Sequence, residues 1–246
     1  MISKTYTKYI QSLHQKKVRD LENAFIAEGS KVVMDLLTSS KIVCDRLLAT
    51  PEWVIENEQQ IRKYSHIPIE AIDAHDLDKI SALSTPNQVL GVFKKLKAGS
   101  IDPMGKVTLV LDSIQDPGNL GTIIRIADWF GVSAIICSDN CVDRYNPKVV
   151  QSTMGSLGRV ELMYTHLADW LIKYPAIPIY VTALNGTGIE SIKGLKEGII
   201  VIGNESKGVS DEILDLANEK ITIPKVGGAE SLNAAVATGI ILSHII

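Results

Sequence analysis

Three segments in the second half of the chain combine glycine with side chains that can bind a ligand or stabilise charge. They read DSIQDPGNLGTIIRIADWFG at 112–131, IVIGNESKGVSDEIL at 200–214 and ITIPKVGGAESLNAAVATGIILSHII at 221–246. Each segment contains or follows the end of an apolar run with strand composition. Because ligands of open parallel sheets bind beyond the carboxyl ends of the strands, the three segments predict one ligand site at one edge of a sheet.

The first segment places an arginine early in a helix. The pattern predicts a turn at 117–118 and a helix that opens at 121–122, with Arg125 and Asp128 three residues apart on one face. One interpretation is a surface ion pair worth a few tenths of a kcal/mol. The other is a cation held near the ligand-binding edge of the sheet.

The second segment, GNESKG at 203–208, differs from a phosphate-binding loop. It lacks the G-x-x-x-x-G-K-[ST] order, and Glu205 would repel phosphate. A carboxylate suits a ligand with amino or hydroxyl donors, and a plain strand–turn–helix with glycine for positive φ is the alternative. In the third segment, Ser231 is either a helix N-cap or part of a site.

Composition and length narrow the class of protein. The chain has 246 residues, 46% of them hydrophobic and 22% charged, as in ordinary globular proteins. Its polar, basic start lacks the apolar region of a signal peptide, and the apolar stretch at 234–246 is too short to cross a membrane. Three cysteines without ligand spacing favour neither a metal site nor a disulfide framework. We expect a cytoplasmic protein without membrane or metal partners.

Charge is unevenly distributed along the chain. The net charge is −3, yet residues 1–100 hold 14 Lys and Arg against 12 Asp and Glu, and residues 101–246 hold 11 against 16. The first 19 residues carry five basic side chains and no acidic one. This basic segment is either a contact for nucleic-acid phosphate or a solvated helix face.

A change in composition divides the chain into two predicted domains. Lys, Gly, Ser and Pro cluster in KKLKAGSIDPMGK, which predicts a linker at 97–106 between a domain at 1–96 and one at 107–246. The first is predicted to be a small α/β domain, with helices at 4–14, 31–37 and 74–80 and strands at 24–28, 42–49, 67–71 and 89–94.

The second domain alternates apolar strands with helical stretches. Runs such as VTLVL and IIVIG lack alternation, which is typical of parallel strands covered on both faces. We predict an open α/β sheet of about six strands and a final helix at 232–246. The strands are expected at 107–111, 134–137, 159–163, 179–183, 199–203 and 220–223.

At this point the sequence resembles a known family. DPGNLGTIIRIADWFG, GNESKG and IPKVGGAESLNAAVA are similar to the three motifs of the SpoU/TrmH branch of the SPOUT RNA methyltransferases, over 107–246. The first domain, with YIQSLHQKKVRDLENAFIAEGSKVVMDLL and STPNQVLGVF, is similar to the ribosomal-protein-like RNA-binding domain of many members.

The resemblance implies a fold, a methyl donor and a site. It implies a trefoil-knotted α/β domain, a homodimer with active sites at the subunit interface, and S-adenosyl-L-methionine as methyl donor. The matching donor positions are Leu184, Asn185, Gly203, Asn204, Glu205, Ile223 and Leu232. The matching catalytic positions are Arg125, Asn119, Ser231 and Asn233.

The implied reaction is methyl transfer to a ribose 2′-hydroxyl of RNA. The family assigns the base to the position of Arg125, but an arginine is essentially always protonated. Holding an RNA phosphate and stabilising the developing alkoxide is the less demanding role. Where the family pattern has Met, this chain has Lys225, which we expect to affect donor binding little and to contact RNA.

Alternatives stay open at this stage. A base methyltransferase of the wider group is disfavoured by the NxGxxxR arrangement of Asn119 and Arg125. Transfer RNA is a possible substrate, although the separate first domain favours ribosomal RNA. A non-catalytic RNA-binding or ribosome-assembly protein is a further alternative, against which the intact motifs argue. The missing G-x-G-x-x-G disfavours a dehydrogenase.

Overall fold

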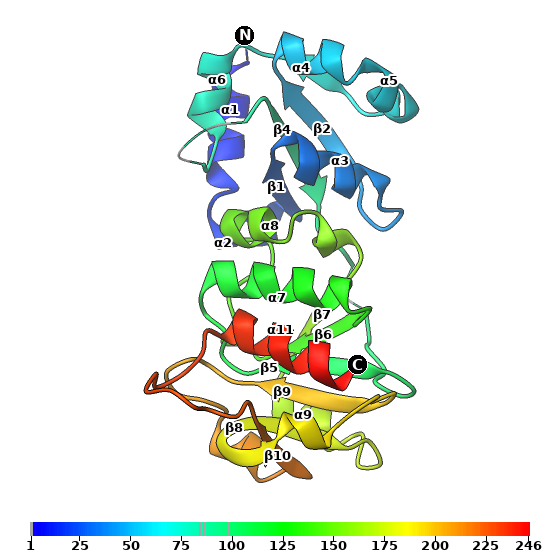
Figure 1. Cartoon of the computed structure of the whole chain (residues 1–246). Helices are drawn as coiled ribbons and strands as arrows, with labels where there is room; N and C mark the ends of the chain where they lie inside the picture. Colours follow the sequence, from blue (N-terminus) through cyan, green and yellow to red (C-terminus); the bar gives the residue numbers. More distant parts are fainter. Residues whose placement is uncertain (1, 84, 86, 98) are drawn as a thin grey trace. The chain divides into compact units, whose positions relative to one another are not determined.

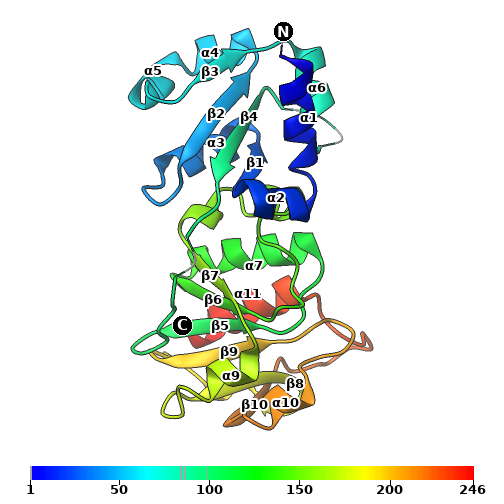
Figure 2. The ribbon, with the colours of Figure 1, turned by 180° about the vertical axis from the view of Figure 1, so that it is seen from behind.

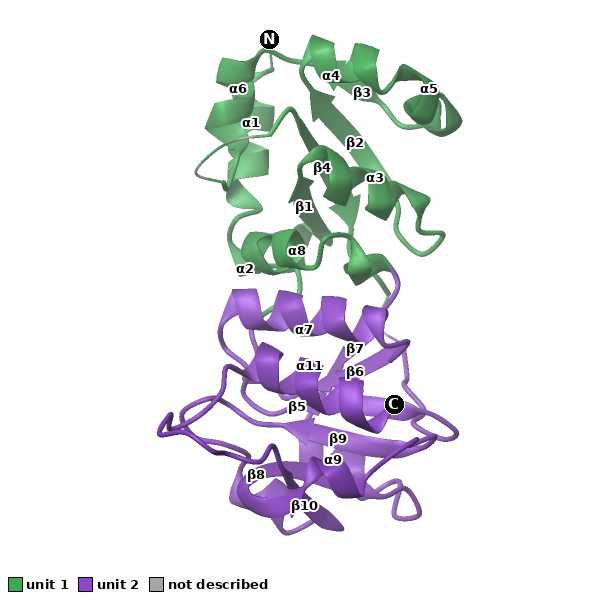
Figure 3. Cartoon of the chain, viewed as in Figure 1, with its two compact units in different colours: residues 1–97, 143–158 green, residues 98–142, 159–246 purple. Residues whose placement is uncertain are grey.

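The computed structural model describes residues 2–83, 85, 87–97 and 99–246. The chain forms two compact units (Figure 3). Unit 1 contains residues 1–97 and 143–158, and unit 2 contains residues 98–142 and 159–246. The grouping of 143–158 with the N-terminal residues was not predicted from the sequence.

Unit 1 is built on a sheet with the strand order β1-β4-β2-β3. Strand β4 (Val89–Lys94) runs antiparallel to β1 (Ala24–Glu28) and to β2 (Cys44–Ala49), while β3 (Ile69–Ala71) is parallel to β2. All four predicted strands are present, although β2 and β3 begin two residues later than expected.

Helices cover both faces of this sheet. On one face α1 (Lys4–Ser12) and α6 (Ala74–Ile80) bury apolar side chains with alternate residues of the strands. On the other, α3 (Ser30–Thr38) and α8 (Pro147–Ser152) do the same. The remaining helices of unit 1 are α2 (Lys16–Glu22), α4 (Pro51–Glu56), α5 (Glu58–Ile61), η1 (Arg62–Tyr64) and η2 (Ser156–Gly158). Both faces of the sheet are therefore buried, which explains the continuous burial of β1 and of most of β4.

The segment 143–158 completes the core of unit 1. The buried Arg19 guanidinium donates to the Asp143 carboxylate, with the closest N–O distance 2.6 Å. The Tyr145 ring lies 4.8 Å from that of Phe25, and the Tyr145 hydroxyl accepts a hydrogen bond from the Leu96 N–H at 2.8 Å. A segment that follows β6 in sequence thus supplies core residues to the N-terminal unit.

Unit 2 contains a six-stranded sheet in the order β10-β8-β9-β5-β6-β7, and every pair of neighbours is parallel. The predicted parallel sheet is confirmed. Its strands are β5 (Val107–Leu111), β6 (Ala134–Cys137), β7 (Glu161–Tyr164), β8 (Ile179–Gly188), β9 (Gly198–Ile202) and β10 (Glu219–Thr222). The trefoil knot that the family resemblance implies stays a prediction.

Helices α7 (Pro117–Trp129) and α11 (Ala234–Ile245) lie side by side against one face of this sheet, and α9 (Leu167–Leu171) and α10 (Asp211–Leu214) lie against the other (Figures 1 and 2). A short 3-10 helix, η3 (Ile189–Ser191), follows β8. Among the helices of the described residues, none has the length and apolar character needed to cross a membrane.

Two helix starts differ from the prediction because of their caps. Helix α7 begins at Pro117, earlier than expected, because the Asp116 carboxylate accepts a hydrogen bond from the Asn119 N–H at 2.8 Å and proline suits the first helical position. Helix α11 is capped by Asn233, so the interpretation of Ser231 as its N-cap was wrong.

Candidate active site

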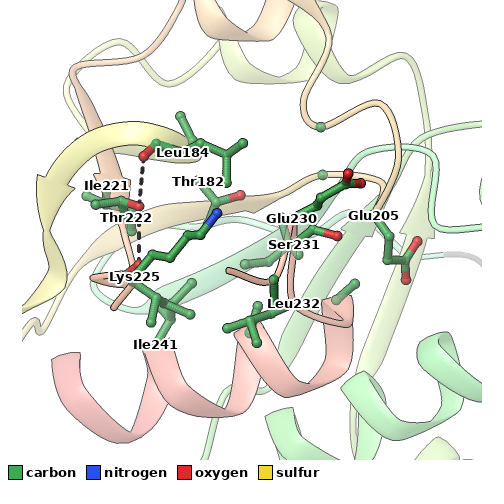
Figure 4. A pocket seen from close by; sticks show the side chains of 18 of the residues that line it. Thr182, Leu184, Glu205, Ile221, Thr222, Lys225, Glu230, Ser231, Leu232 and Ile241 are labelled. Carbon is green, nitrogen blue, oxygen red and sulfur yellow. Dashed lines mark hydrogen bonds between the residues drawn. The ribbon is translucent and has the colours of Figure 1, made fainter. Parts of the chain in front are cut away.

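A pocket of about 510 Å³ lies at the carboxyl ends of β9 and β10 and beside the middle of β8 (Figure 4). On one wall the Thr222 hydroxyl lies 3.4 Å from the Leu184 carbonyl oxygen, which joins the end of β10 to the middle of β8. The size is typical of small-molecule sites. The lining contains two lysines, two glutamates and five polar uncharged residues, Thr182, Asn204, Ser206, Thr222 and Ser231. Its apolar side chains include Ile202, Ile221, Ile223, Leu232, Ala234, Ala237 and Ile241.

The loop after β9 is a closed turn whose shape depends on Gly203 and Asn204. The backbones of Asn204 and Gly208 exchange hydrogen bonds of 3.0 and 2.8 Å. The Asn204 side chain accepts from two backbone N–H groups inside the turn and donates to the Ser113 carbonyl at 3.0 Å. A Cβ at Gly203 would come within 2.3 Å of the Gly208 backbone. The Asn204 amide is therefore committed to holding the loop, which leaves its backbone to line the pocket.

The loop after β5 fixes this turn from the other side. Asp112 is buried, and its carboxylate accepts from the Ser210 N–H at 2.9 Å and from the Ser113 hydroxyl at 3.0 Å. Ser113 adopts a left-handed conformation with φ of 58°, and its N–H donates to the Ser138 hydroxyl at 2.9 Å. Local hydrogen bonds of this kind are what hold a non-glycine residue at positive φ.

Asn119 connects all three predicted segments. Its amide NH₂ donates to the Glu205 carboxylate, and its carbonyl oxygen accepts from the Asn233 amide at 2.8 Å. The Asn233 oxygen in turn accepts from the first N–H groups of α11. The predicted convergence of the three segments is thus observed. Because both ends of the Asn119 and Asn233 side chains are engaged, these residues position the loops in this chain.

Arg125 has a different environment. Its side chain is exposed, it does not line the pocket, and no hydrogen bond or ion pair of its guanidinium is found in the described part of the chain. Asp128 pairs with Arg159 at 2.8 Å instead, so the interpretation of Arg125 and Asp128 as a surface ion pair was wrong. Ser231 is exposed on the third segment and lines the pocket.

The predicted donor positions converge on the pocket with one exception. Leu184, Gly203, Asn204, Glu205, Ile223 and Leu232 line it, whereas Asn185 is exposed and does not. Lining residues that sequence reasoning missed include Thr182 and three side chains of α11. Their spacing at 234, 237 and 241 places them on one helix face, and this periodicity could have identified them.

Two thiols lie close to the loop after β5. Cys141 is nearly buried, and its sulfur accepts from the Ile114 N–H and lies 3.3 Å from the Leu111 carbonyl oxygen. A hydrogen bond from Cys137, with smaller contributions from Ser138 and the Ile114 backbone, lowers the pKa of Cys141 to about 7 against the opposing effect of burial. All three cysteines are free, and no group of three metal-binding side chains occurs within the described residues.

Two family models match the chain in sequence order. Residues 106–243 match the model described as the SpoU rRNA Methylase family, and residues 4–91 match the MRM3-like substrate binding domain. The first match contains the candidate site, and the second lies within unit 1.

Similar proteins agree with these matches over nearly the whole chain. The 23S rRNA (guanosine(2553)-2'-O)-methyltransferase RlmP of Bacillus subtilis (strain 168) is 31% identical, and the alignment covers 96% of this chain and 93% of RlmP. A putative RNA methyltransferase of the TrmH family from Porphyromonas gingivalis is 32% identical with a TM-score of 0.84, covering 99% of this chain and 98% of the other. An AdoMet-bound rRNA methyltransferase from Sinorhizobium meliloti is 31% identical with a TM-score of 0.87, covering 100% and 96%. The chain belongs to the SpoU rRNA Methylase family.

Proposed function

We propose that this RNA methyltransferase transfers a methyl group from S-adenosyl-L-methionine to a ribose 2′-hydroxyl of ribosomal RNA. The observation that carries the proposal is the hydrogen-bonded junction of Asn119, Glu205 and Asn233, which joins three loops beside a ligand-sized pocket. The similarity to RlmP and to the AdoMet-bound enzyme of Sinorhizobium meliloti supports the acceptor and the donor.

The pocket fits the donor in size and in chemistry. Its aliphatic walls suit an adenine ring, and the tight turn at Gly203 brings backbone against the ligand space. The backbones of Leu184, Gly203, Ile223 and Leu232 would hold the adenosine, and the Glu205 carboxylate is available to hydroxyl or amino donors. When bound, the donor supplies an electrophilic methyl group on a sulfonium.

The exposed Arg125 is assigned to the RNA acceptor. Its guanidinium has five N–H donors in a planar fork, a geometry that matches phosphate. In this role it holds the phosphate beside the target ribose and stabilises the alkoxide that develops as the hydroxyl loses its proton. Ser231, exposed at the pocket, is placed to contact the acceptor as well.

A second copy of the chain is part of the proposal. Arg125 lies outside the pocket lining of its own chain, which supports a homodimer whose sites are completed across the subunit interface. We propose a cytoplasmic location, for which the three free cysteines are the support.

Ribosomal RNA is preferred over transfer RNA as the substrate. Unit 1 matches a substrate-binding domain model, and its first two helices carry four exposed lysines of the N-terminal segment, Lys4, Lys8, Lys16 and Lys17. The fifth basic residue of that segment, Arg19, is buried against Asp143 and is not available to RNA. Structured RNA is recognised through its shape and its 2′-hydroxyl and phosphate contacts, for which a separate basic unit is suited.

Methyl transfer from tritiated S-adenosyl-L-methionine to ribosomal RNA, followed by nucleoside mass spectrometry, tests the proposal. Labelled 2′-O-methyl nucleosides are the expected product. A methylated base would replace the proposal with the base-methylating alternative. No transfer to any RNA, with donor binding intact, would favour the RNA-binding or ribosome-assembly alternative.

Substitution of Arg125 separates the acceptor role from donor binding. We expect Arg125→Ala to lower the rate of transfer by about 10²- to 10³-fold, the size of the loss when one group that stabilises a transition-state anion is removed. The Kd of S-adenosylhomocysteine, measured by titration calorimetry, should stay within about twofold because Arg125 does not line the pocket. Arg125→Lys, which keeps the charge, should recover part of the rate. Normal turnover in Arg125→Ala would contradict the assignment.

A further inference from the structure

Lys225 lies where its side chain meets the donor pocket. The sequence predicts that this residue contacts RNA and affects donor binding little, whereas the structure makes it part of the pocket lining. Figure 4 shows its side chain reaching from the loop after β10 toward Thr182. No hydrogen bond or ion pair of the Lys225 ammonium is found among residues 2–83, 85, 87–97 and 99–246.

The other charged side chains of the pocket do not neutralise this ammonium. Glu205 accepts the hydrogen bond from Asn119, and Glu230 forms no ion pair with Lys225 or with the second lysine of the lining, Lys207. The walls near Lys225 include the aliphatic side chains of Ile221 and Ile241 (Figure 4). A ligand that covered the Lys225 ammonium would remove this charge from water. Without an anionic group on the ligand to pair with the ammonium, that loss of hydration is unfavourable.

The chemistry of the donor supplies the missing anion. This step rests on the proposed function: S-adenosyl-L-methionine carries an adenosine, a cationic sulfonium, an ammonium and one carboxylate. The carboxylate is its one anionic group. We propose that Lys225 binds the carboxylate of the donor's amino-acid moiety and thereby selects the intact donor over adenosine thioethers that lack this moiety.

The proposal is tested by comparing how substitution of Lys225 changes the Kd of two ligands. S-Adenosylhomocysteine carries the carboxylate, and 5′-methylthioadenosine has the same adenosine and a thioether but no amino-acid moiety. Lys225→Met keeps an unbranched chain of similar length and removes the charge. If Lys225 contacts the carboxylate, Lys225→Met should weaken the binding of S-adenosylhomocysteine and leave the binding of 5′-methylthioadenosine nearly unchanged.

Titration calorimetry with both ligands tests this on the full chain. For Lys225→Met we expect the Kd of S-adenosylhomocysteine to rise about 10- to 100-fold, the range for a hydrogen bond to a charged group. The Kd of 5′-methylthioadenosine should change by less than about threefold. Lys225→Arg should retain most of the affinity, and Lys207→Met, the matched loss of a positive charge from the facing loop, should leave the ratio of the two Kd values near that of the wild type.

Other outcomes overturn the inference in distinguishable ways. An equal loss for both ligands would assign Lys225 to packing, and unchanged Kd values with a raised KM for RNA would assign it to the acceptor. A selective loss in Lys207→Met would transfer the role to Lys207. If the wild type bound neither ligand, the proposed function itself would fail, whereas wild-type binding without a selective loss would overturn this inference alone.

Discussion

The ion pair between Arg19 and Asp143 ties the segment 143–158 to the N-terminal fold, and Asp143→Asn tests how much unit 1 depends on it. The side chains are 2% and 11% exposed, and two guanidinium N–H groups donate to one carboxylate oxygen at 2.6 and 3.1 Å. Removing one partner of a buried pair costs about 3–5 kcal/mol because it leaves an uncompensated charge. Arg19 keeps its hydrogen bonds to the carbonyls of Leu13 and His14, and an asparagine oxygen still accepts one bond. We therefore expect a loss of about 2–4 kcal/mol in the free energy of unfolding.

Urea unfolding followed by tryptophan fluorescence measures this loss in unit 1. Trp53 is buried in unit 1, and Trp129 is 84% exposed, so its emission changes little on unfolding. In a Trp170→Phe background, which removes the buried tryptophan of unit 2, Trp53 becomes the main reporter. With a denaturant slope of about 2 kcal/mol/M, the middle of the usual range for urea, the midpoint should fall by roughly 1–2 M.

A surface pair of the same unit provides the control. Glu58 and Arg62 form an exposed i,i+4 pair at 2.8 Å, so Glu58→Gln should cost less than about 0.5 kcal/mol. Arg19→Met and the double variant complete a cycle in which the double loss should be smaller than the sum of the single losses. If Asp143→Asn destabilised unit 1 no more than Glu58→Gln, or if the cycle were additive, the assigned role of the buried pair would be refuted.

Two further expectations concern unit 2. Gly203→Ala should weaken binding of S-adenosylhomocysteine roughly 10- to 100-fold in calorimetry, because the added Cβ meets the Gly208 backbone. Gly239→Ala is the control and should leave the affinity unchanged, because the nearest atom to its added Cβ is 3.6 Å away. Equal affinities of the two variants would contradict the tight-turn argument. The fold lowers the pKa of Cys141 from 9.0 to about 7. Between pH 7 and pH 9 the Cys141 thiol is therefore mostly protonated in the unfolded chain and mostly ionised in the folded chain. The free energy of unfolding should rise from pH 7 to pH 9 by up to about 1.4 kcal/mol per pH unit and lose this contribution as the pH falls through 7. Urea titrations at pH 7, 8 and 9 should show a steeper rise in the wild type than in Cys141→Ser, and parallel profiles would disprove the shift.

Much of unit 2 could be predicted because its strands are buried on both faces. Apolar runs without alternation identify parallel strands, and in a parallel sheet their carboxyl ends meet at one edge. That rule predicted that the segments at 200–214 and 221–246 meet at one edge, and the family resemblance selected Gly203, Glu205, Ile223 and Leu232 within them. All four line the pocket. What a pattern of single residues cannot give is the pairing of side chains. From the sequence alone, the Asn119 amide could face solvent, Arg125 or either loop. Its hydrogen bonds to Glu205 and Asn233 depend on loop conformations, which the hydrophobic periodicity of the sequence does not encode.

Unit 1 was harder because its core is not contiguous in sequence. The apolar residues of 143–158 lie between two strands of unit 2, where a pattern assigns them to the nearer sheet. Their partners are more than 100 residues away, as in the contacts of Arg19 with Asp143 and of Phe25 with Tyr145. Periodicity reports which face of an element is buried and gives no information on which distant element covers it.

The same discontinuity changes how unit 1 is attached to unit 2. A single linker at 97–106 would make unit 1 a tethered module, free to sample positions set by the linker length. The chain instead passes between the units three times, near residues 97, 142 and 158. The second and third passages frame a segment whose buried ion pair and aromatic contacts belong to the core of unit 1. Releasing unit 1 to the range of a single tether would therefore require extracting Asp143 and Tyr145 from that core, at the cost of a buried charge. Because that cost is a large part of a domain's stability, the segment 143–158 stays with unit 1 as long as unit 1 is folded, and three passages of the chain, rather than one linker, join unit 1 to unit 2.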